Sequence, residues 1–282
     1  MVVDLVWGWY LLTVSLLALA YGWGGGSGQP LLYALLHLGL FAVMLFIRAR
    51  TATASPYDRR YYRGAFALFA VPLVFSAMGL VLPALHPEPW EWTWMAWDRA
   101  LLGSDPTVAA GGWLTPAWTE LLQWVYTSFY AIPIVTIATL GWRRGGDEFD
   151  RALITVTFCF LVTYLGYFLW PTLPPYLFLP HDGALEGTFM AGSLIKVLEW
   201  LEVHRWNCFP SGHTMLSVVC LVLAVRVRVL FWILMPVVSL MLVSTVALRY
   251  HYVQDVIAGV VLAWPAYRVA GLIHRWGAEA EK

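Results

Sequence analysis

Charged residues are scarce in this sequence. Of its 282 residues, 12% are charged and 60% are hydrophobic, and the formal net charge is zero. A soluble domain usually carries about 25% charged residues, so this deficit indicates a chain whose main solvent is lipid. The lack of net positive charge removes the basic field that would attract a nucleic acid. We therefore expect a membrane protein that does not bind nucleic acid.

Cysteines are also few. Cys159 and Cys220 lie inside apolar runs, and Cys208 lies in a polar loop without an obvious partner, so no disulfide framework is inferred. A catalytic Cys208 thiol is an alternative, but the nearby histidines explain the site better. The first apolar run lacks the basic segment and the small-residue cleavage site of a signal peptide, which predicts a retained helix.

Long apolar runs dominate what is present. A membrane-spanning helix needs about 20 apolar residues, and eight runs come close to or reach that length. They cover residues 4–22, 30–47, 64–84, 119–141, 152–170, 211–225, 229–248 and 253–273. Residues 22–30 form a turn-rich break between the first two runs, although one broken or re-entrant element is an alternative. The pattern predicts an all-α polytopic membrane protein with about eight transmembrane helices.

The basic residues are distributed unevenly among the predicted loops. Thirteen of the seventeen fall on one side, and four, which are Arg99, Lys196, Arg205 and Arg249, fall on the other. The thirteen are Arg48, Arg50, Arg59, Arg60, Arg63, Arg143, Arg144, Arg151, Arg226, Arg228, Arg268, Arg275 and Lys282. Cytoplasmic loops are enriched in Lys and Arg. We therefore expect cytoplasmic termini and extracytoplasmic loops at residues 85–118 and 171–210.

Both of these long loops contain an amphipathic segment. Apolar residues share one helical face, and acidic or basic residues share the other. The first stripe is Trp90, Trp94, Trp97 and Leu101, opposed by Glu91 and Asp98; the second is Leu194, Val197, Leu198 and Leu201, opposed by Lys196, Glu199 and Glu202. We predict two interfacial helices, which either anchor the loops or border a lateral entry for a lipid substrate.

The strongest local motif is Pro-Ser-Gly-His at residues 210–213. Ser211 is a good N-cap for the helix predicted to follow, and His213 would lie in the first turn of that helix. The free N–H groups at a helix N-terminus form a natural phosphate site. Ser211 and Gly212 are therefore candidate substrate-binding residues, and His213 is a candidate catalytic residue.

A second motif, residues 249–255, is predicted to lie on the same side of the membrane. His251 and Asp255 are four residues apart and so share one face of a starting helix. A carboxylate can hold an imidazole in one tautomer, which leaves the other ring nitrogen as a nucleophile or a base. A metal site with His213 as the third ligand is the competing interpretation, but we expect neither a metal nor a cofactor.

Together these motifs resemble the type 2 phosphatidic acid phosphatase superfamily. The resemblance rests on Pro-Ser-Gly-His followed, 38 residues after His213, by the histidine of an HxxxD pair. It implies a six-helix catalytic core at residues 64–275, preceded by two helices and a basic loop at 1–63 and followed by a short tail at 276–282. It also implies that His251 attacks phosphorus to form a phosphohistidine, that His213 protonates the leaving group, and that Asp255 orients His251.

Two departures from the phosphatases point to a branch of that superfamily. The region of their KxxxxxxRP motif, here residues 166–176, has no Lys or Arg, and Thr245 stands where they carry an arginine. Both departures resemble inositol phosphorylceramide synthase and sphingomyelin synthase, and the GYxLxPTxPP pattern at 166–175 is most similar to the former. The resemblance implies transfer of a phosphorylated head group between lipids. A lipid phosphate phosphatase, or a non-enzymatic transporter or scaffold, is the alternative.

The lack of basic residues also predicts the charge of the substrate. A phosphodiester carries one negative charge and needs fewer cationic partners than a monoester. Arg249 and Arg205 lie near the two motifs and are candidate phosphate ligands, with Tyr176 as a further substrate-binding residue. Attraction of the two arginines to anionic lipid headgroups is the alternative. The donor lipid, the acceptor lipid and the oligomeric state remain open at this point.

Overall fold

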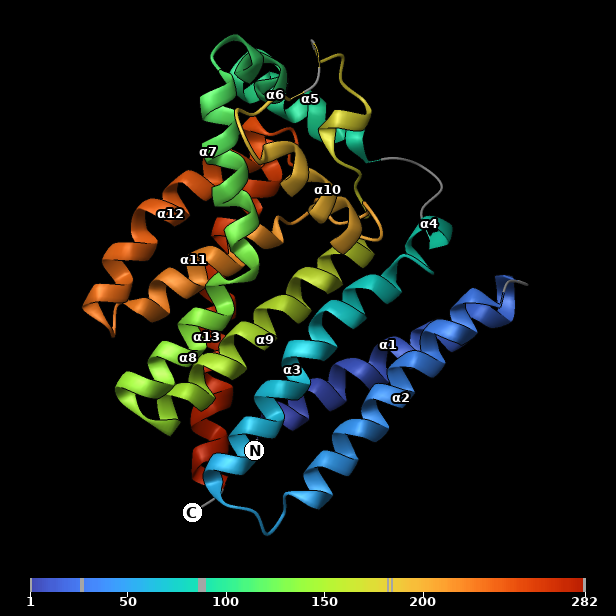
Figure 1. The fold of residues 1–282 in the computed structure, drawn as a ribbon. Coiled ribbons are helices and arrows are strands. Elements are labelled where there is room, and N and C mark those ends of the chain that lie inside the picture. Colours follow the sequence, from blue (N-terminus) through green and yellow to red (C-terminus); the bar gives the residue numbers. More distant parts are fainter. Residues whose placement is uncertain (1, 26–27, 86–89, 182, 184, 281–282) are drawn as a thin grey trace.

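The fold is that of a computed structural model, which describes residues 2–25, 28–85, 90–181, 183 and 185–280. Every regular element within these residues is a helix (Figure 1). This confirms the all-α prediction. Two residues of the predicted topology lie outside the described residues. They are Lys282, predicted on the basic side, and Asp182, predicted in the second outer loop.

Six helices are long and apolar enough to cross a membrane, which confirms a polytopic membrane protein. They are α1 (Val3–Gly25), α2 (Gln29–Arg50), α3 (Pro56–Met78), α9 (Gly146–Leu169), α12 (Arg228–Ala247) and α13 (Val253–Ala280). Because α13 continues to Ala280, most of the tail predicted at 276–282 is helical.

Two of the eight predicted spans differ from simple transmembrane helices. The run at 119–141 is divided into α7 (Pro116–Thr127), η2 (Ser128–Tyr130) and α8 (Ile132–Arg144), with a bend of 54° between the halves. The run at 211–225 becomes α11 (Gly212–Ala224), which has 13 residues. At 1.5 Å per residue α11 is about 20 Å long, shorter than the roughly 30 Å hydrocarbon layer.

The predicted amphipathic segments are helices α5 (Glu91–Leu102) and α10 (Ala191–Leu201). The remaining short elements are α4 (Leu82–Leu85), α6 (Pro106–Ala109), η1 (Ala110–Gly112) and η3 (Pro175–Leu177). In α5 the acidic face points inward: Glu91 and Asp98 are 0% and 1% exposed, whereas Trp97 is 55% exposed. The acidic face of α5 is thus buried in the protein. Backbone N–H groups donate hydrogen bonds to its two carboxylates there.

Two large parts of the hydrophobic core meet along α9, and a smaller third cluster, made of Trp94, Met95, Leu179 and Tyr252, lies beside α5. One part joins α1, α2 and α3 to a face of α9 that includes Leu153 and Tyr164. The other joins α7, α8, α11, α12 and α13 to the face that includes Val156 and Cys159. Both predicted catalytic motifs belong to helices of the second part.

The predicted basic loops gather at one end of the molecule, where both termini also lie (Figure 1). Ion pairs tie these loops together there, between Arg63 and Asp4, Arg60 and Asp150, and Arg226 and Glu148. Helices α5, α6 and α10 lie at the other end, which is called the catalytic end below. This arrangement is consistent with the predicted topology, in which the basic loops and the two long loops lie on opposite sides of the membrane.

Candidate active site

The Pro-Ser-Gly-His motif starts helix α11 as predicted. The Ser211 Oγ accepts a hydrogen bond from the Thr214 backbone N at 3.2 Å, which is the bond of an N-cap. Gly212 is the first residue of the helix, and His213 follows in its first turn. Both Ser211 and His213 are buried. The motif therefore places an imidazole next to the N–H groups of a helix N-terminus.

The two motifs are joined through their backbones. The Ser211 N–H donates to the carbonyl oxygen of Asp255 at 3.0 Å. One turn further along α13, Gly259 allows the closest approach, since a Cβ on it would lie 2.8 Å from the Ser211 carbonyl oxygen. A larger residue at 259 would push the helices apart. The sequence separates these motifs by about 40 residues, and the fold makes them one unit.

The segment at residues 166–176 packs against the Pro-Ser-Gly-His motif. Gly166 has no room for a Cβ because Pro210 packs against it, and a Cβ on Gly212 would lie 2.6 Å from the Tyr167 hydroxyl. The Thr172 carbonyl accepts a hydrogen bond from the Cys208 N–H at 3.2 Å. The segment that lacks the KxxxxxxRP motif of the phosphatases therefore forms one wall of the candidate site.

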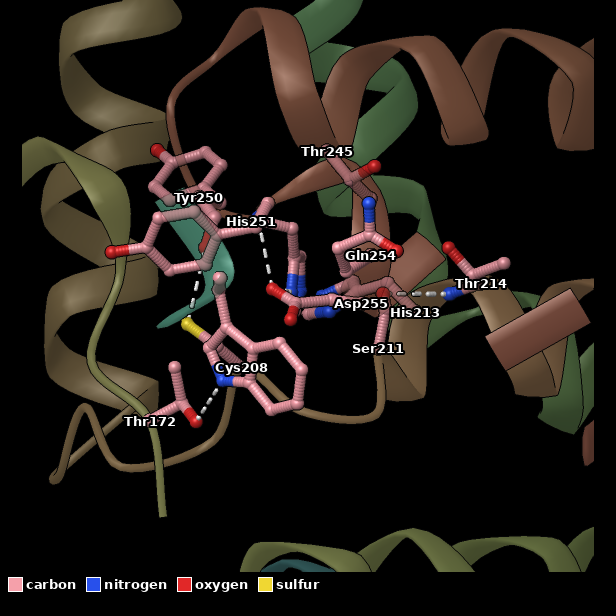
Figure 2. Close-up of polar contacts among 12 residues, drawn as sticks. Thr172, Cys208, Ser211, His213, Thr214, Thr245, Tyr250, His251, Gln254 and Asp255 are labelled. Carbon is pink, nitrogen blue, oxygen red and sulfur yellow. Dashed lines mark hydrogen bonds and ion pairs between the residues drawn. The ribbon is translucent and has the colours of Figure 1, made fainter. Parts of the chain in front are cut away.

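His251 is buried and held by its side chain and by its backbone N–H (Figure 2). Its Nδ1 lies 3.3 Å from the Asp255 Oδ2, and its backbone N–H donates to the carbonyl of Thr245 at 2.9 Å. The same Asp255 oxygen accepts from the Tyr252 N–H at 2.9 Å. Asp255 is fully buried. The predicted His–Asp pair therefore exists, and it leaves the His251 Nε2 as the nitrogen not used by the carboxylate.

His213 stands opposite this pair, with its ring held between aromatic side chains. Its ring centroid lies 4.2 Å from that of Tyr126, 4.1 Å from that of Phe129 and 5.9 Å from that of His251. Its Nδ1 is 3.4 Å from the Tyr126 hydroxyl. Its Nε2 is buried and has no hydrogen-bond partner among the described residues. One nitrogen of each histidine therefore remains for a substrate.

Two carboxylates of α5, which the sequence analysis did not include in the site, fix the surrounding loops. Asp98 accepts hydrogen bonds from the Val253 and Gln254 N–H groups at 2.9 and 3.3 Å, at the start of α13. Glu91 accepts one from the Leu173 N–H at 2.6 Å. Burial raises the pKa of both carboxyls. Asp98 thus satisfies N–H groups that the start of α13 leaves unpaired and positions the segment that carries His251, whereas Glu91 holds the loop at Leu173.

A small pocket opens beside His251. Its volume is about 20 Å³, and the predicted substrate-binding residues Arg205 and Tyr176 line it. The Arg205 guanidinium lies 5.5 Å from the Tyr176 ring centroid and 3.8 Å from Glu199. The other lining residues, which were not predicted, are Tyr126, Pro174, Glu202, Asn207, Cys208 and Tyr250. The amphipathic pattern predicted that Glu202 faces solvent. In the structure it lines the pocket, and burial raises the pKa of its carboxyl.

Arg249 lies apart from this pocket. Its φ of 69° is left-handed, and its guanidinium donates to the Gly183 carbonyl at 2.9 Å. It lines a second cavity of about 360 Å³ together with His181 and Thr119. Among the residues predicted to bind substrate, the structure thus brings Arg205, Tyr176, Ser211 and Gly212 to the histidines and places Arg249 in the neighbouring cavity.

Cys208 is a neighbour of the catalytic pair. Its Sγ donates to the Tyr250 carbonyl at 3.3 Å, and burial raises the pKa of its thiol well above the usual value. A protonated, buried thiol is a poor nucleophile. One donor atom each of Cys208, His251 and Asp255 lie within 4.8 Å of one another, so these three could hold a metal ion. Cys208 thus takes the place that the metal interpretation had given to His213.

Comparison with known proteins agrees with this geometry. Residues 92–269, more than half of the chain, match the PAP2 superfamily. A PA-phosphatase related-family protein of Dictyostelium discoideum is 21% identical over 263 residues, which covers 78% of this chain and 48% of that protein. The chain thus spans about half the length of this curated relative. No solved structure matches. The chain belongs to the PAP2 superfamily.

Proposed function

We propose that the protein transfers a phosphorylated head group from a phospholipid donor to the hydroxyl of another lipid, through a phosphohistidine at His251. The observation that carries this proposal is the buried arrangement of two histidines. His251 is oriented by Asp255 at 3.3 Å, and His213 faces it with a nitrogen that has no partner among the described residues. Such an arrangement supplies a nucleophile and a proton donor on two sides of one phosphorus atom.

In the first step the His251 Nε2 attacks the phosphorus of the donor. The new P–N bond forms as the bond between phosphorus and the diacylglycerol oxygen breaks, and His213 gives its proton to that oxygen. Asp255 stabilises the positive charge that develops on the His251 ring. Diacylglycerol leaves, and the head group stays on His251 as a phosphoramidate.

In the second step the hydroxyl oxygen of the acceptor lipid attacks the same phosphorus. His213 takes the hydroxyl proton as the P–N bond breaks, and His251 returns to its starting state. The N–H groups at the start of α11 are placed to bind the phosphoryl oxygens. Arg205 supplies a positive charge at the pocket, and a charge-assisted hydrogen bond from it would suit a singly charged phosphodiester.

A labelled-lipid assay tests the proposal. Purified protein in detergent is given a phosphodiester lipid labelled in its head group, together with a lipid alcohol. Transfer places the label on the alcohol, and acid-labile label on the protein reports the phosphohistidine. If the label appeared only as a water-soluble phosphate ester, the reaction would be hydrolysis and not transfer.

The charge of the preferred substrate is a second test. The phosphatases of this family carry cations at positions where this chain has none, as at Thr245. We therefore expect kcat/KM for a phosphodiester lipid to exceed that for a phosphatidic-acid-like monoester in the same micelles, because a dianion needs more cationic partners. A clear preference for the monoester would exclude the transferase.

Lipid phosphate hydrolysis is the second candidate. The pocket beside His251 has a volume of about 20 Å³, which is room for about one water molecule. Water in the place of the acceptor hydroxyl would release the phosphoryl group by the same second step. The Dictyostelium relative also has a phosphatase-related name.

We further propose that the catalytic end faces the extracytoplasmic side. The loops at the opposite end carry most of the basic residues, as cytoplasmic loops do. A reporter fused after Arg144 should be cytoplasmic, and one fused near Gly183 should be extracytoplasmic. The reverse labelling would place the reaction in the cytoplasmic leaflet.

A further inference from the structure

Glu202 is an acidic residue in a pocket that is built for an anion. It follows the last residue of α10 and lines the pocket beside His251 together with Arg205 and Tyr176. It is the one carboxylate among the described residues that line this pocket. A phosphate bound to His251 would therefore face a negative charge, which calls for an explanation.

The charge of Glu202 is directed at the pocket. Its Oε1 accepts a hydrogen bond from the Tyr130 hydroxyl at 3.3 Å, and its carboxylate is close enough to His251 and Arg205 to interact electrostatically with both. The ion pair of Arg205 within the described residues is with Glu199, at 3.8 Å. The Glu202 carboxylate is thus held by hydrogen bonds from Tyr130 and Asn207, and the ion pairs of the described residues do not include it.

Tyrosines around the pocket strengthen its effect. Tyr126, Tyr176 and Tyr250 line the same space, and the Tyr126 and Tyr250 rings stack with centroids 4.4 Å apart. Aromatic rings and the small pocket volume limit the water that could screen Glu202. Charges in such partly dry surroundings interact more strongly than they do in bulk water.

We infer that Glu202 is a specificity-determining residue that rejects dianionic phosphomonoesters and admits singly charged phosphodiesters. This inference rests on the proposed reaction at His251. A monoester brings about −1.5 to −2 charges and a diester brings one, so the repulsion from Glu202 differs between the two. One additional unit charge a few ångströms from a carboxylate is worth roughly 10-fold to 100-fold in transition-state binding at a protein surface.

The test compares Glu202→Gln with wild type on a matched pair of lipids, a phosphatidic-acid-like monoester and a phosphodiester with the same acyl chains. Substrate consumption is followed, so the readout does not depend on whether water or an alcohol is the acceptor. We expect the monoester-to-diester ratio of kcat/KM to rise about 10-fold or more. Glu202→Asp keeps the charge and should keep the wild-type ratio.

Glu279→Gln is the matched control, since it removes the same charge from an exposed position at the end of α13, away from the residues that line the pocket. It should leave the ratio within about twofold. An unchanged ratio in Glu202→Gln, or an equal rise in Glu279→Gln, would overturn the inference. A wild-type enzyme that releases only water-soluble phosphate would refute the proposed transfer and leave the ratio test in force, so the two failures are distinguishable.

Discussion

The two ends of the molecule bind their carboxylates in different ways. At the end with the termini, buried or partly buried acids pair with arginines, as in Asp4 with Arg63 at 2.9 Å and Glu148 with Arg226 at 2.6 Å. At the catalytic end, ion pairs such as Asp105 with Arg99 involve exposed side chains, and three other acids accept backbone N–H groups. Asp98 binds the start of α13, Glu91 binds Leu173, and Glu120 binds the backbone before α10.

The difference reflects what each end has to hold. The ion pairs join helices whose backbone N–H and C=O groups are already hydrogen-bonded within the helix. These helices therefore do not need a carboxylate to fix their backbone. A carboxylate bound to backbone N–H groups fixes the chain itself, and the catalytic end consists of loops whose N–H groups would otherwise be unpaired. We therefore expect changes at the catalytic end to lower activity and changes at the opposite end to lower stability.

The sharpest contrast is between two histidine–carboxylate pairs with the same separation. His251 lies 3.3 Å from Asp255 at the catalytic end, and His274 lies 3.3 Å from Asp147 at the opposite end. His251→Ala should abolish turnover and the covalent phosphoryl-enzyme, because it removes the nucleophile. His274→Ala should keep both. Labelling the protein with a head-group-labelled donor measures the difference, and substantial turnover by His251→Ala would remove the nucleophile assignment.

The next largest effect is expected from His213. His213→Ala should slow formation of the phosphoryl-enzyme by roughly 10²–10⁴-fold, which is the usual contribution of general acid catalysis. The loss should shrink with a donor whose leaving group is a weakly basic phenol, since that oxygen needs no proton. Single-turnover rates with the two donors give the comparison. An equal loss with both donors would indicate that His213 binds the substrate without protonating it.

Asp4→Ala tests the opposite end. It removes the carboxylate that pairs with Arg63, whose side chain is 6% exposed, and removing one partner of a buried pair costs roughly 3–5 kcal/mol. The thermal unfolding midpoint in detergent should therefore fall, while kcat of the folded enzyme should stay near wild type. A selective loss of kcat with an unchanged midpoint would contradict the division of roles.

Asp98→Ala should lower stability less than Asp4→Ala does. It leaves the Val253 and Gln254 N–H groups unpaired, at a cost of about 1–3 kcal/mol, and it frees the segment that orients His251. We expect a larger fractional loss of kcat than of KM. Asp105→Ala is the control, because Asp105 pairs with the exposed Arg99 and such surface pairs contribute about 0–1 kcal/mol. Equal losses in both variants would show that Asp98 has no positioning role.

The sequence predicted the long helices well because lipid imposes one simple requirement on them. The run at 229–248 became α12 at Arg228–Ala247, and 30–47 became α2 at Gln29–Arg50. The bend between α7 and α8 was not predicted, since apolar composition continues through it. The bounds of the run at 211–225 were also close, but its length of 13 helical residues was treated as a full span.

The site was predictable where the chemistry is local. His251 and Asp255 are four residues apart, and the Ser211 cap is a bond between neighbours, so short motifs contain them. The pair does not share a helical face as predicted, because α13 begins at Val253 and His251 lies in the loop before it. Asp98 and Glu202 were missed because amphipathic patterning assigns polar residues to water. Only the tertiary packing shows that the acidic face of α5 turns inward and that Glu202, just after the end of α10, reaches the pocket. Arg249 was expected at the phosphate because it precedes His251 by two residues, but the left-handed backbone at Arg249 accompanies a side chain that reaches Gly183.

The shortness of α11 determines how deep in the bilayer the reaction takes place. Its last turn lies beside the ion pair of Arg226 with Glu148 at the basic end. From there 13 residues rise about 20 Å, which is less than the thickness of a hydrocarbon layer of about 30 Å. For the proposed reaction we therefore expect the phosphorus to bind below the plane of the surrounding headgroups. Lipids whose phosphate is joined to a long, flexible anchor can make that descent more easily than water-soluble phosphate esters, so membrane insertion itself contributes to substrate choice.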